Sequence, residues 1–189
     1  MTTSPLTPSP GPLLTRVSPE LGPELGRYVV RHRAEVEAMI RTGGREAGLP
    51  AARRYAKVFD GLLGALFGAV EATMRKSGEW QPVALAAVGS YGRGAVAFAS
   101  DLDVRLLPAG GVLEAAQPIA EALLYPLWDA GLSVGHQVIS PDEVIELGRT
   151  DLPTATSLLD WRHVAGARDA SARLLERVFE GLFGIGEIR

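Results

Sequence analysis

Two aspartates separated by a single residue, Asp101 and Asp103, are the side chains of this sequence that are best suited to chemistry. Side chains two positions apart on a strand point to the same face of a sheet, so a strand here would present both carboxylates together. Two like charges this close repel each other, and a divalent cation that prefers oxygen ligands, Mg²⁺ or Mn²⁺, is the usual compensation. A solvated acidic strand face is the alternative, and the pair alone does not decide between the two.

A glycine-rich segment with the sequence GSYGRG, residues 89–94, is separated from the first aspartate by six residues. Backbone N–H groups exposed in such a loop can hold phosphate oxygens, while its serine and arginine add a hydroxyl donor and a forked cation. The segment is not a P-loop, because Gly-Lys-Ser/Thr is missing, and it lacks the Gly-x-Gly-x-x-Gly spacing of a dinucleotide fingerprint. Phosphate donors on one loop and paired carboxylates on the next strand together predict a nucleoside triphosphate site. The candidate nucleotide-binding residues are Gly89, Ser90, Arg93, Gly94 and Ser100.

Hydrophobic periodicity predicts the elements that must position these residues. Apolar residues recur near 3.6-residue spacing over residues 24–42 and 51–76, which predicts two helices. The short apolar run 83–88 predicts a buried strand that leads into the glycine-rich loop. Beyond the loop we expect strands at 102–107, 132–139 and 158–165, and helices at 112–130, 142–149, 153–157 and 170–183. Helices packed on a small mixed sheet predict an α+β fold.

The chain divides into three parts by composition. Residues 1–23 contain six of the thirteen prolines and are expected to form a disordered tail, with a docking peptide as the alternative. Residues 24–80 are expected to form an N-terminal helical support. Residues 81–189 are expected to form the core that carries the site, together with a C-terminal helix.

Length and composition restrict the class of protein. A chain of 189 residues with 47% hydrophobic residues describes a globular protein with room for one core. Its formal charge of −3 offers no electrostatic reason to bind nucleic acid or an anionic membrane. No apolar run reaches the roughly 18 residues that a membrane helix needs. The chain has no cysteine, which excludes disulfides and thiolate zinc sites and fits a reducing cytosol, so we expect a cytoplasmic protein.

The glycine-serine pair followed by Asp101-x-Asp103 resembles the signature of the DNA polymerase beta-type nucleotidyltransferase superfamily. The fuller pattern, residues 88–94 and 100–103, is similar to the N-terminal catalytic domain of the bacterial PII-protein uridylyltransferase. Further similarity lies in the segments 30–36, 125–132, 134–136 and 158–160, so that the resemblance covers roughly residues 25–180.

The resemblance implies an enzyme that moves a nucleoside monophosphate from a nucleoside triphosphate to a protein hydroxyl with Mg²⁺ or Mn²⁺. The implied donor is UTP, and the implied acceptor is a tyrosine of a PII-type signal protein. Nucleic acid is not expected as a partner, because the formal charge is −3 and no basic aromatic stripe is present. The superfamily also requires a third acidic metal ligand on a neighbouring strand, for which Asp160 is the candidate. The alternative for Asp160 is a structural carboxylate at a strand end, paired with Arg162 or Arg149.

Three departures from the family pattern leave other functions open. Ala95 stands where the family has glutamate, Arg105 stands where it has an aliphatic residue, and the expected strand 134–138 contains no acid. Arg105 would either contact a triphosphate or a partner, or take the place of the metal as a counter-ion. The alternatives are an AMP-transferring enzyme of the antitoxin type and a non-catalytic nucleotide-binding regulatory module. The resemblance covers the transferase half of the family alone, so uridylyl removal and small-molecule sensing are not implied.

Overall fold

The computed structural model describes residues 21–184, which form an α+β fold with a mixed sheet flanked by helices, as expected. Residues 1–20 of the expected tail lie outside the described part of the chain. The elements are α1 (Leu21–Thr42), η2 (Gly44–Glu46), α2 (Leu49–Ser77), β1 (Val83–Ala87), α3 (Gly89–Gly92), β2 (Leu102–Pro108), α4 (Leu113–Asp129), β3 (Val134–Val138), α5 (Pro141–Gly148), α6 (Leu152–Leu159), β4 (Arg162–Gly166) and α7 (Arg168–Gly181).

The four strands follow the spatial order β3-β2-β1-β4. Strand β1 is antiparallel to both of its neighbours, whereas β2 and β3 run parallel. The parallel register places Asp103 of β2 opposite Gly135 of β3, and Arg105 opposite Gln137. The strand with the predicted metal ligands is therefore internal to the sheet, with β3 on one side and β1 on the other.

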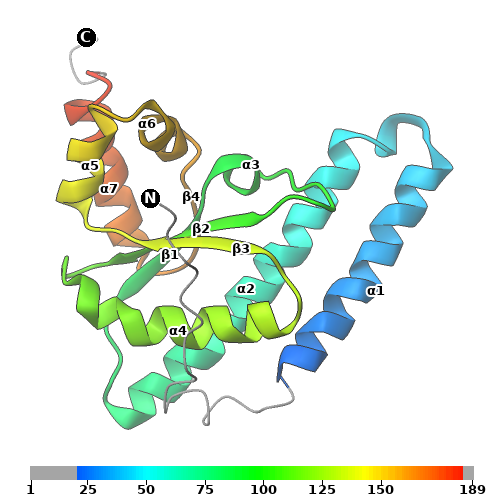
Figure 1. Ribbon diagram of the computed structural model, residues 1–189, viewed down its shortest axis with the longest axis horizontal. Coiled ribbons are helices and arrows are strands. Elements are labelled where there is room, and N and C mark those ends of the chain that lie inside the picture. The colour runs from blue at the N-terminus through cyan, green and yellow to red at the C-terminus, as the bar shows by residue number, and fades with distance from the viewer. Residues whose placement is uncertain (1–20, 185–189) are drawn as a thin grey trace, which may run out of the picture.

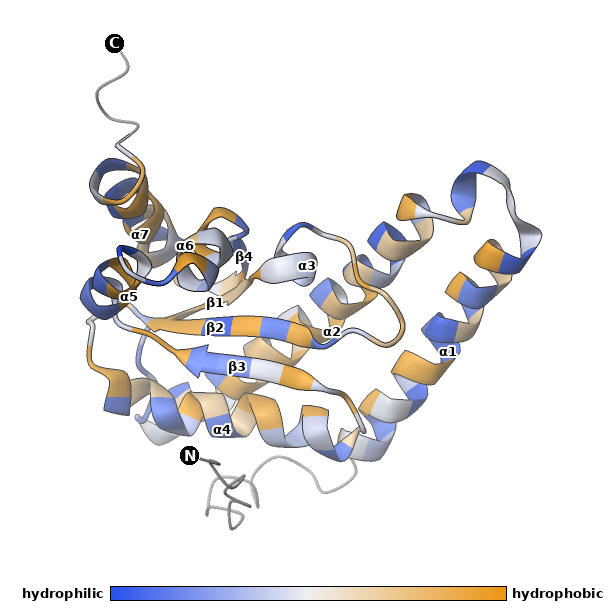
Figure 2. Cartoon of the chain, turned by 45° about the horizontal axis from the view of Figure 1, so that its top comes forward, coloured by the Kyte–Doolittle hydropathy of each residue, from blue (hydrophilic) through white to orange (hydrophobic). Residues whose placement is uncertain are grey.

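Helices cover both faces of the sheet (Figures 1 and 2). On one face, side chains such as Leu85, Val104 and Leu106 join a buried cluster with apolar residues of α1, α2 and α4. On the other face, Leu107 joins a second cluster with residues of α5, α6 and α7. Because side chains alternate along a strand, Asp103 lies on this second face.

Helices α1 and α2 are joined through η2 and pack against each other; α1 lies at the edge of the molecule, whereas α2 runs from there beneath the sheet (Figure 1). Helix α2 carries the continuous apolar stripe expected from the sequence, with Phe59, Leu63 and Phe67 all buried. Helix α1 begins at Leu21, so residues 21–23, which were expected in the tail, belong to its first turn. Pro23 is tolerated there because the first N–H groups of a helix have no partner within it. Across residues 21–184, no helix has the length and hydropathy needed to cross a membrane.

The prediction of a fourth strand over residues 158–165 is wrong at its start. Helix α6 continues to Leu159, Asp160 caps its C-terminal end, and β4 begins only at Arg162. Asp151 is the N-cap of α6, because its carboxylate accepts a hydrogen bond of 2.8 Å from the backbone N–H of Thr154. Two adjacent leucines fit a helix end, where here only Leu158 is buried, as well as a strand, so a short apolar run does not distinguish the two structures.

Candidate functional site

The Asp103 carboxylate lies between two glycines. A Cβ atom at Gly135 would lie 2.5 Å from Asp103 Oδ1, and one at Gly89 would lie 3.4 Å from Asp103 Oδ2. Gly89 also has a φ of 60°, in the left-handed region that favours glycine. The first residue of the glycine-rich loop therefore lies next to the carboxylate of the predicted metal ligand, as the nucleotide-site hypothesis requires.

Both aspartates are available to a ligand. Asp101 is exposed and directly precedes β2, while Asp103 is the half-buried second residue of that strand. Within residues 21–184, neither carboxylate makes a hydrogen bond or an ion pair. Two unpartnered carboxylates are the hard oxygen donors that Mg²⁺ and Mn²⁺ prefer, so this donor set fits such an ion.

Arg105 follows on the same face of β2. Burial lowers the pKa of its guanidinium, and the nearby charge of Asp103 acts in the opposite direction. Its Nη1 donates a hydrogen bond of 3.0 Å to the Val104 carbonyl. The cation therefore lies close enough to Asp103 to offset part of its charge without forming an ion pair with it.

The glycine-rich loop folds into the single helical turn α3. The N–H groups of Gly92 and Arg93 donate to the carbonyls of Val88 and Gly89 at 2.9 and 3.0 Å. The Gly94 N–H donates to the Tyr91 carbonyl at 3.0 Å and is therefore used inside the loop. The N–H groups that open a helical turn have no partner within it, so the start of α3 and the Ser90 hydroxyl remain for a ligand.

Arg93 is occupied by an acidic partner. Its guanidinium Nη1 donates to Asp160 Oδ2, although the Arg93 side chain is 61% exposed. Of the two roles considered for Asp160, this contact favours that of a structural carboxylate. Its partner, however, is Arg93 rather than Arg162 or Arg149.

Asp160 is not assembled with the other two aspartates. No group of three or more His, Cys, Asp or Glu residues in the described part of the chain is arranged to hold a metal ion. Asp160 lies at the end of α6, just before β4, and β1 separates β4 from the strand of Asp103. Its role as a third metal ligand therefore stays a prediction without support from the geometry.

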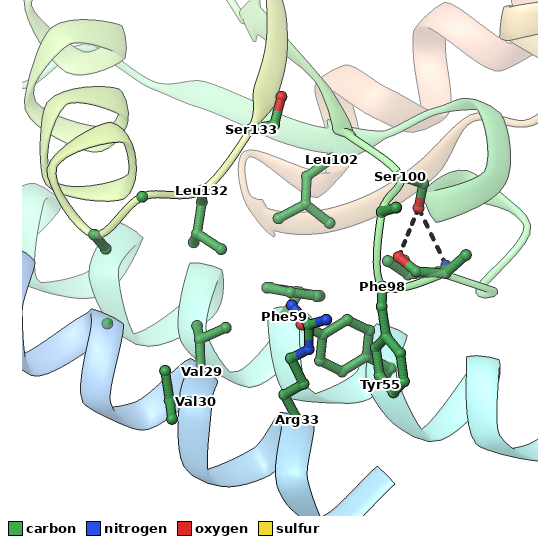
Figure 3. A pocket seen from close by; sticks show the side chains of 16 residues that line it. Val29, Val30, Arg33, Tyr55, Phe59, Phe98, Ser100, Leu102, Leu132 and Ser133 are labelled. Atoms are coloured by element: carbon green, nitrogen blue, oxygen red, sulfur yellow. Dashed lines mark hydrogen bonds between the residues drawn. The ribbon is translucent and has the colours of Figure 1, made fainter. Parts of the chain in front are cut away.

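Ser100 contributes to the shape of the loop that leads into β2. Its hydroxyl accepts a hydrogen bond from the Ala97 N–H at 3.1 Å and donates to the Ala97 carbonyl at 3.0 Å. Ser100 also lines a cavity of about 340 Å³ between this loop, α1, α2 and the segment before β3 (Figure 3). Aromatic side chains form one wall of this cavity, where the Tyr55 and Phe98 rings meet edge to face at 5.0 Å.

Three residues that the sequence analysis did not single out as site residues meet beneath the glycine-rich loop. Tyr91 is fully buried, and its hydroxyl donates a hydrogen bond of 2.9 Å to Asp60 Oδ1 on α2. Arg162 of β4 donates from Nη2 to the same oxygen at 2.9 Å. Asp60 is the one acidic residue between positions 51 and 70, within an otherwise apolar helical stripe. This isolated charge is the feature of the sequence that could have indicated a buried polar contact.

A Gly-Ser loop against an aspartate-bearing strand, on a mixed sheet flanked by helices, is consistent with a nucleotidyltransferase core. No family model matches the chain. Curated relatives do match it, among them three bifunctional uridylyltransferase/uridylyl-removing enzymes. Over about 70% of its length, this chain is a homologue of part of these enzymes.

The protein of Streptomyces coelicolor is 40% identical over 133 residues, which are 70% of this chain and 15% of that protein. The protein of Novosphingobium aromaticivorans is 39% identical over 128 residues, or 66% of this chain and 14% of the relative. The protein of Phenylobacterium zucineum is 35% identical over 133 residues, or 69% of this chain and 14% of the relative. The chain thus spans about one seventh of the length of the curated relatives it matches.

Proposed function

We propose that this chain is a metal-dependent nucleotidyltransferase that moves a nucleoside monophosphate from a nucleoside triphosphate to a protein hydroxyl. The observation that carries the proposal is the position of the Asp103 carboxylate beside Gly89, because it places an unpartnered carboxylate next to the predicted phosphate-binding loop. The names of the relatives support uridylyl transfer, and UTP is therefore the proposed donor. A tyrosine hydroxyl of a PII-type signal protein is the proposed acceptor, and the cytoplasm is the proposed location.

In the proposed reaction, the acceptor hydroxyl oxygen forms a bond to the α-phosphorus, the bond from that phosphorus to the pyrophosphate oxygen breaks, and the hydroxyl proton passes to solvent. Asp101 and Asp103 would hold Mg²⁺ or Mn²⁺, which when bound supplies positive charge to offset that of the phosphates. The Ser90 hydroxyl and the opening N–H groups of α3 would bind oxygens of the departing pyrophosphate.

The other candidate residues receive more limited roles in this proposal. Arg93 is ion-paired with Asp160. To bind a phosphate, its guanidinium must break this ion pair or contact both groups at once. The Gly94 N–H and the Ser100 hydroxyl are used inside their own loops, so these residues shape the site rather than bind the nucleotide directly.

A non-catalytic nucleotide-binding module is the second candidate function. Arg105 lies on the face of Asp103, and the residues of β3 opposite this pair are Gly135 and Gln137 rather than an acid. A site with two carboxylates and a neighbouring guanidinium can bind a nucleotide without completing the arrangement that transfer requires.

Label transfer tests the proposal directly. The chain is incubated with α-³²P-labelled UTP or ATP, with Mg²⁺ or Mn²⁺, and with or without a purified PII protein. The transferase is supported if the unmodified chain labels the acceptor and the Asp101→Asn/Asp103→Asn variant does not. The matched control is Asp142→Asn/Asp169→Asn, which removes two exposed carboxylates on α5 and α7. Transfer that persists in the first variant contradicts the mechanism, whereas nucleotide binding without any transfer favours the regulatory module.

A further inference from the structure

Arg162 donates hydrogen bonds to two backbone carbonyls at the C-terminal end of α3. Its Nη2 donates to the Tyr91 carbonyl at 3.0 Å, and its Nε donates to the Gly92 carbonyl at 3.2 Å. The last carbonyls of a helix have no partner within it, and a turn of four residues has little stability of its own. The orientation of α3 therefore depends on a side chain that arrives from β4, seventy positions along the chain.

Tyr91 and Asp60 form a hydrogen-bonded network with Arg162 on the buried side of α3. The guanidinium of Arg162 lies 5.1 Å from the centre of the Tyr91 ring, and both side chains donate to the same oxygen of Asp60. Burial raises the pKa of the Tyr91 hydroxyl, which keeps it a neutral hydrogen-bond donor. The three residues come from α2, α3 and β4, so the network ties the loop to both a long helix and the sheet.

Close packing leaves α3 little freedom to adjust around this network. A Cβ atom at Gly92 would collide with the backbone carbonyl of Asp160, and it would lie 3.1 Å from the Ala87 carbonyl. The loop is therefore held between the end of β1 and the junction of α6 with β4. Any rotation of α3 must break either this packing or the hydrogen bonds to Arg162.

We propose that Asp60, Tyr91 and Arg162 are positioning residues that hold the Gly89–Gly92 turn in the orientation required for nucleotide binding. None of the three carries an atom that we place on the substrate, and each acts through the backbone of α3. The effect of this network on nucleotide binding rests on the proposed function, whereas its effect on the orientation of the Gly89–Gly92 turn does not.

Three substitutions separate positioning from general stability. Tyr91→Phe removes only the hydroxyl, Asp60→Asn removes only the charge, and Arg162→Lys keeps a cation but cannot make the same set of bonds. The matched controls are Tyr125→Phe, on α4, and Asp142→Asn, an aspartate paired with Arg177 at the surface. The variants retain their side-chain volume or charge, so that the fold is preserved.

Hydrogen exchange is measured on peptides that contain residues 88–95, with peptides from α7 as the internal reference. The amides of Gly92, Arg93 and Gly94 should exchange about tenfold faster in the three variants, since each loses or weakens a hydrogen bond that involves a charged group. Exchange in α7 and in both control variants should be unchanged. Equal acceleration in α7, or no acceleration in the loop, would overturn the positioning role.

The consequence for binding is measured by calorimetry with UTP and Mg²⁺. The affinity of the three variants should fall about tenfold, whereas the controls should bind like the unmodified protein. Unchanged affinity together with a faster-exchanging loop would overturn the link between loop position and binding. If the unmodified protein binds neither UTP nor ATP, the proposed function fails, and the exchange experiment still decides whether the network positions the loop.

Discussion

The carboxylate of Asp103 lies against Gly135, the residue opposite it in the parallel pairing of β2 with β3. Any side chain at position 135 would place its Cβ atom 2.5 Å from an oxygen of that carboxylate. The position on β3 that faces Asp103 is therefore filled by the carboxylate itself. This packing explains in physical terms why β3 carries no acid beside Asp103 and has a glycine there instead.

Gly135→Ala should displace the Asp103 carboxylate. We expect Mg²⁺-dependent binding of UTP to weaken at least about tenfold and the free energy of unfolding to fall by about 1–3 kcal/mol, typical of overpacking. Calorimetry and urea unfolding measure the two effects. Gly64→Ala is the control, because no atom lies within 4 Å of a Cβ at this helical position, and it should stabilise α2 by up to about 1 kcal/mol. Unweakened binding in Gly135→Ala would show that Asp103 is not held in place by this contact.

The ion pair between Arg93 and Asp160 should contribute little to stability. Because the Arg93 side chain is 61% exposed, solvent screens the pair, and we expect a coupling energy below about 1 kcal/mol. A double-mutant cycle with Arg93→Ala and Asp160→Ala, followed by urea unfolding, measures this coupling. A coupling energy well above this value would mean that the pair locks the loop to α6.

Asp160→Asn should preserve most nucleotide binding, in contrast to Asp103→Asn. Asp160 contacts Arg93 and belongs to no metal-binding group in the described residues, so its charge affects the site only through that arginine. We expect the affinity for UTP and Mg²⁺ to change by less than about tenfold in Asp160→Asn. The same titration with Asp103→Asn should show no metal-dependent binding. Loss of binding in both variants would instead support Asp160 as the third metal ligand.

Protonation of His163 should destabilise the fold in mild acid. Burial on β4 lowers the pKa of His163 below its ordinary value, and the charge of Arg168 acts in the same direction. The unfolded chain therefore binds this proton at a higher pH than the folded protein does. The resulting stability is present above about pH 6.5, the ordinary pKa, and is lost as the pH falls through the lowered pKa.

Urea unfolding between pH 7.5 and pH 5 measures this dependence. His163→Gln removes the titrating group while keeping a polar side chain near Ser171, which lies 3.2 Å from the imidazole Nδ1. The variant should lose less stability over this range than the unmodified protein. An equally steep loss in both proteins would assign the pH dependence to other groups, among them His136, whose pKa burial also lowers.

The secondary structure was largely predictable because it depends on neighbours in sequence. The apolar run 83–88 predicts β1, the strand expected over 102–107 corresponds to β2, and the stripe of 51–76 predicts α2, all close to their observed bounds. The glycine-rich loop and Asp101-x-Asp103 were recognisable for the same reason, since their chemistry lies in one short segment. The start of β4 was not predictable, because two leucines fit either a helix end or a strand.

The partners of the site residues were decided by the tertiary structure alone. Arg93 meets Asp160 across 67 positions, and Asp60 meets Arg162 across 102, at distances that no local pattern encodes. The order of the strands also separates Asp160 from Asp103, although both are acidic residues in apolar segments. Residue type and spacing thus determine which chemistry a segment can perform. The packing of α2, α3 and β4 determines which charges meet, because contacts between distant segments depend on how the whole chain closes around its core.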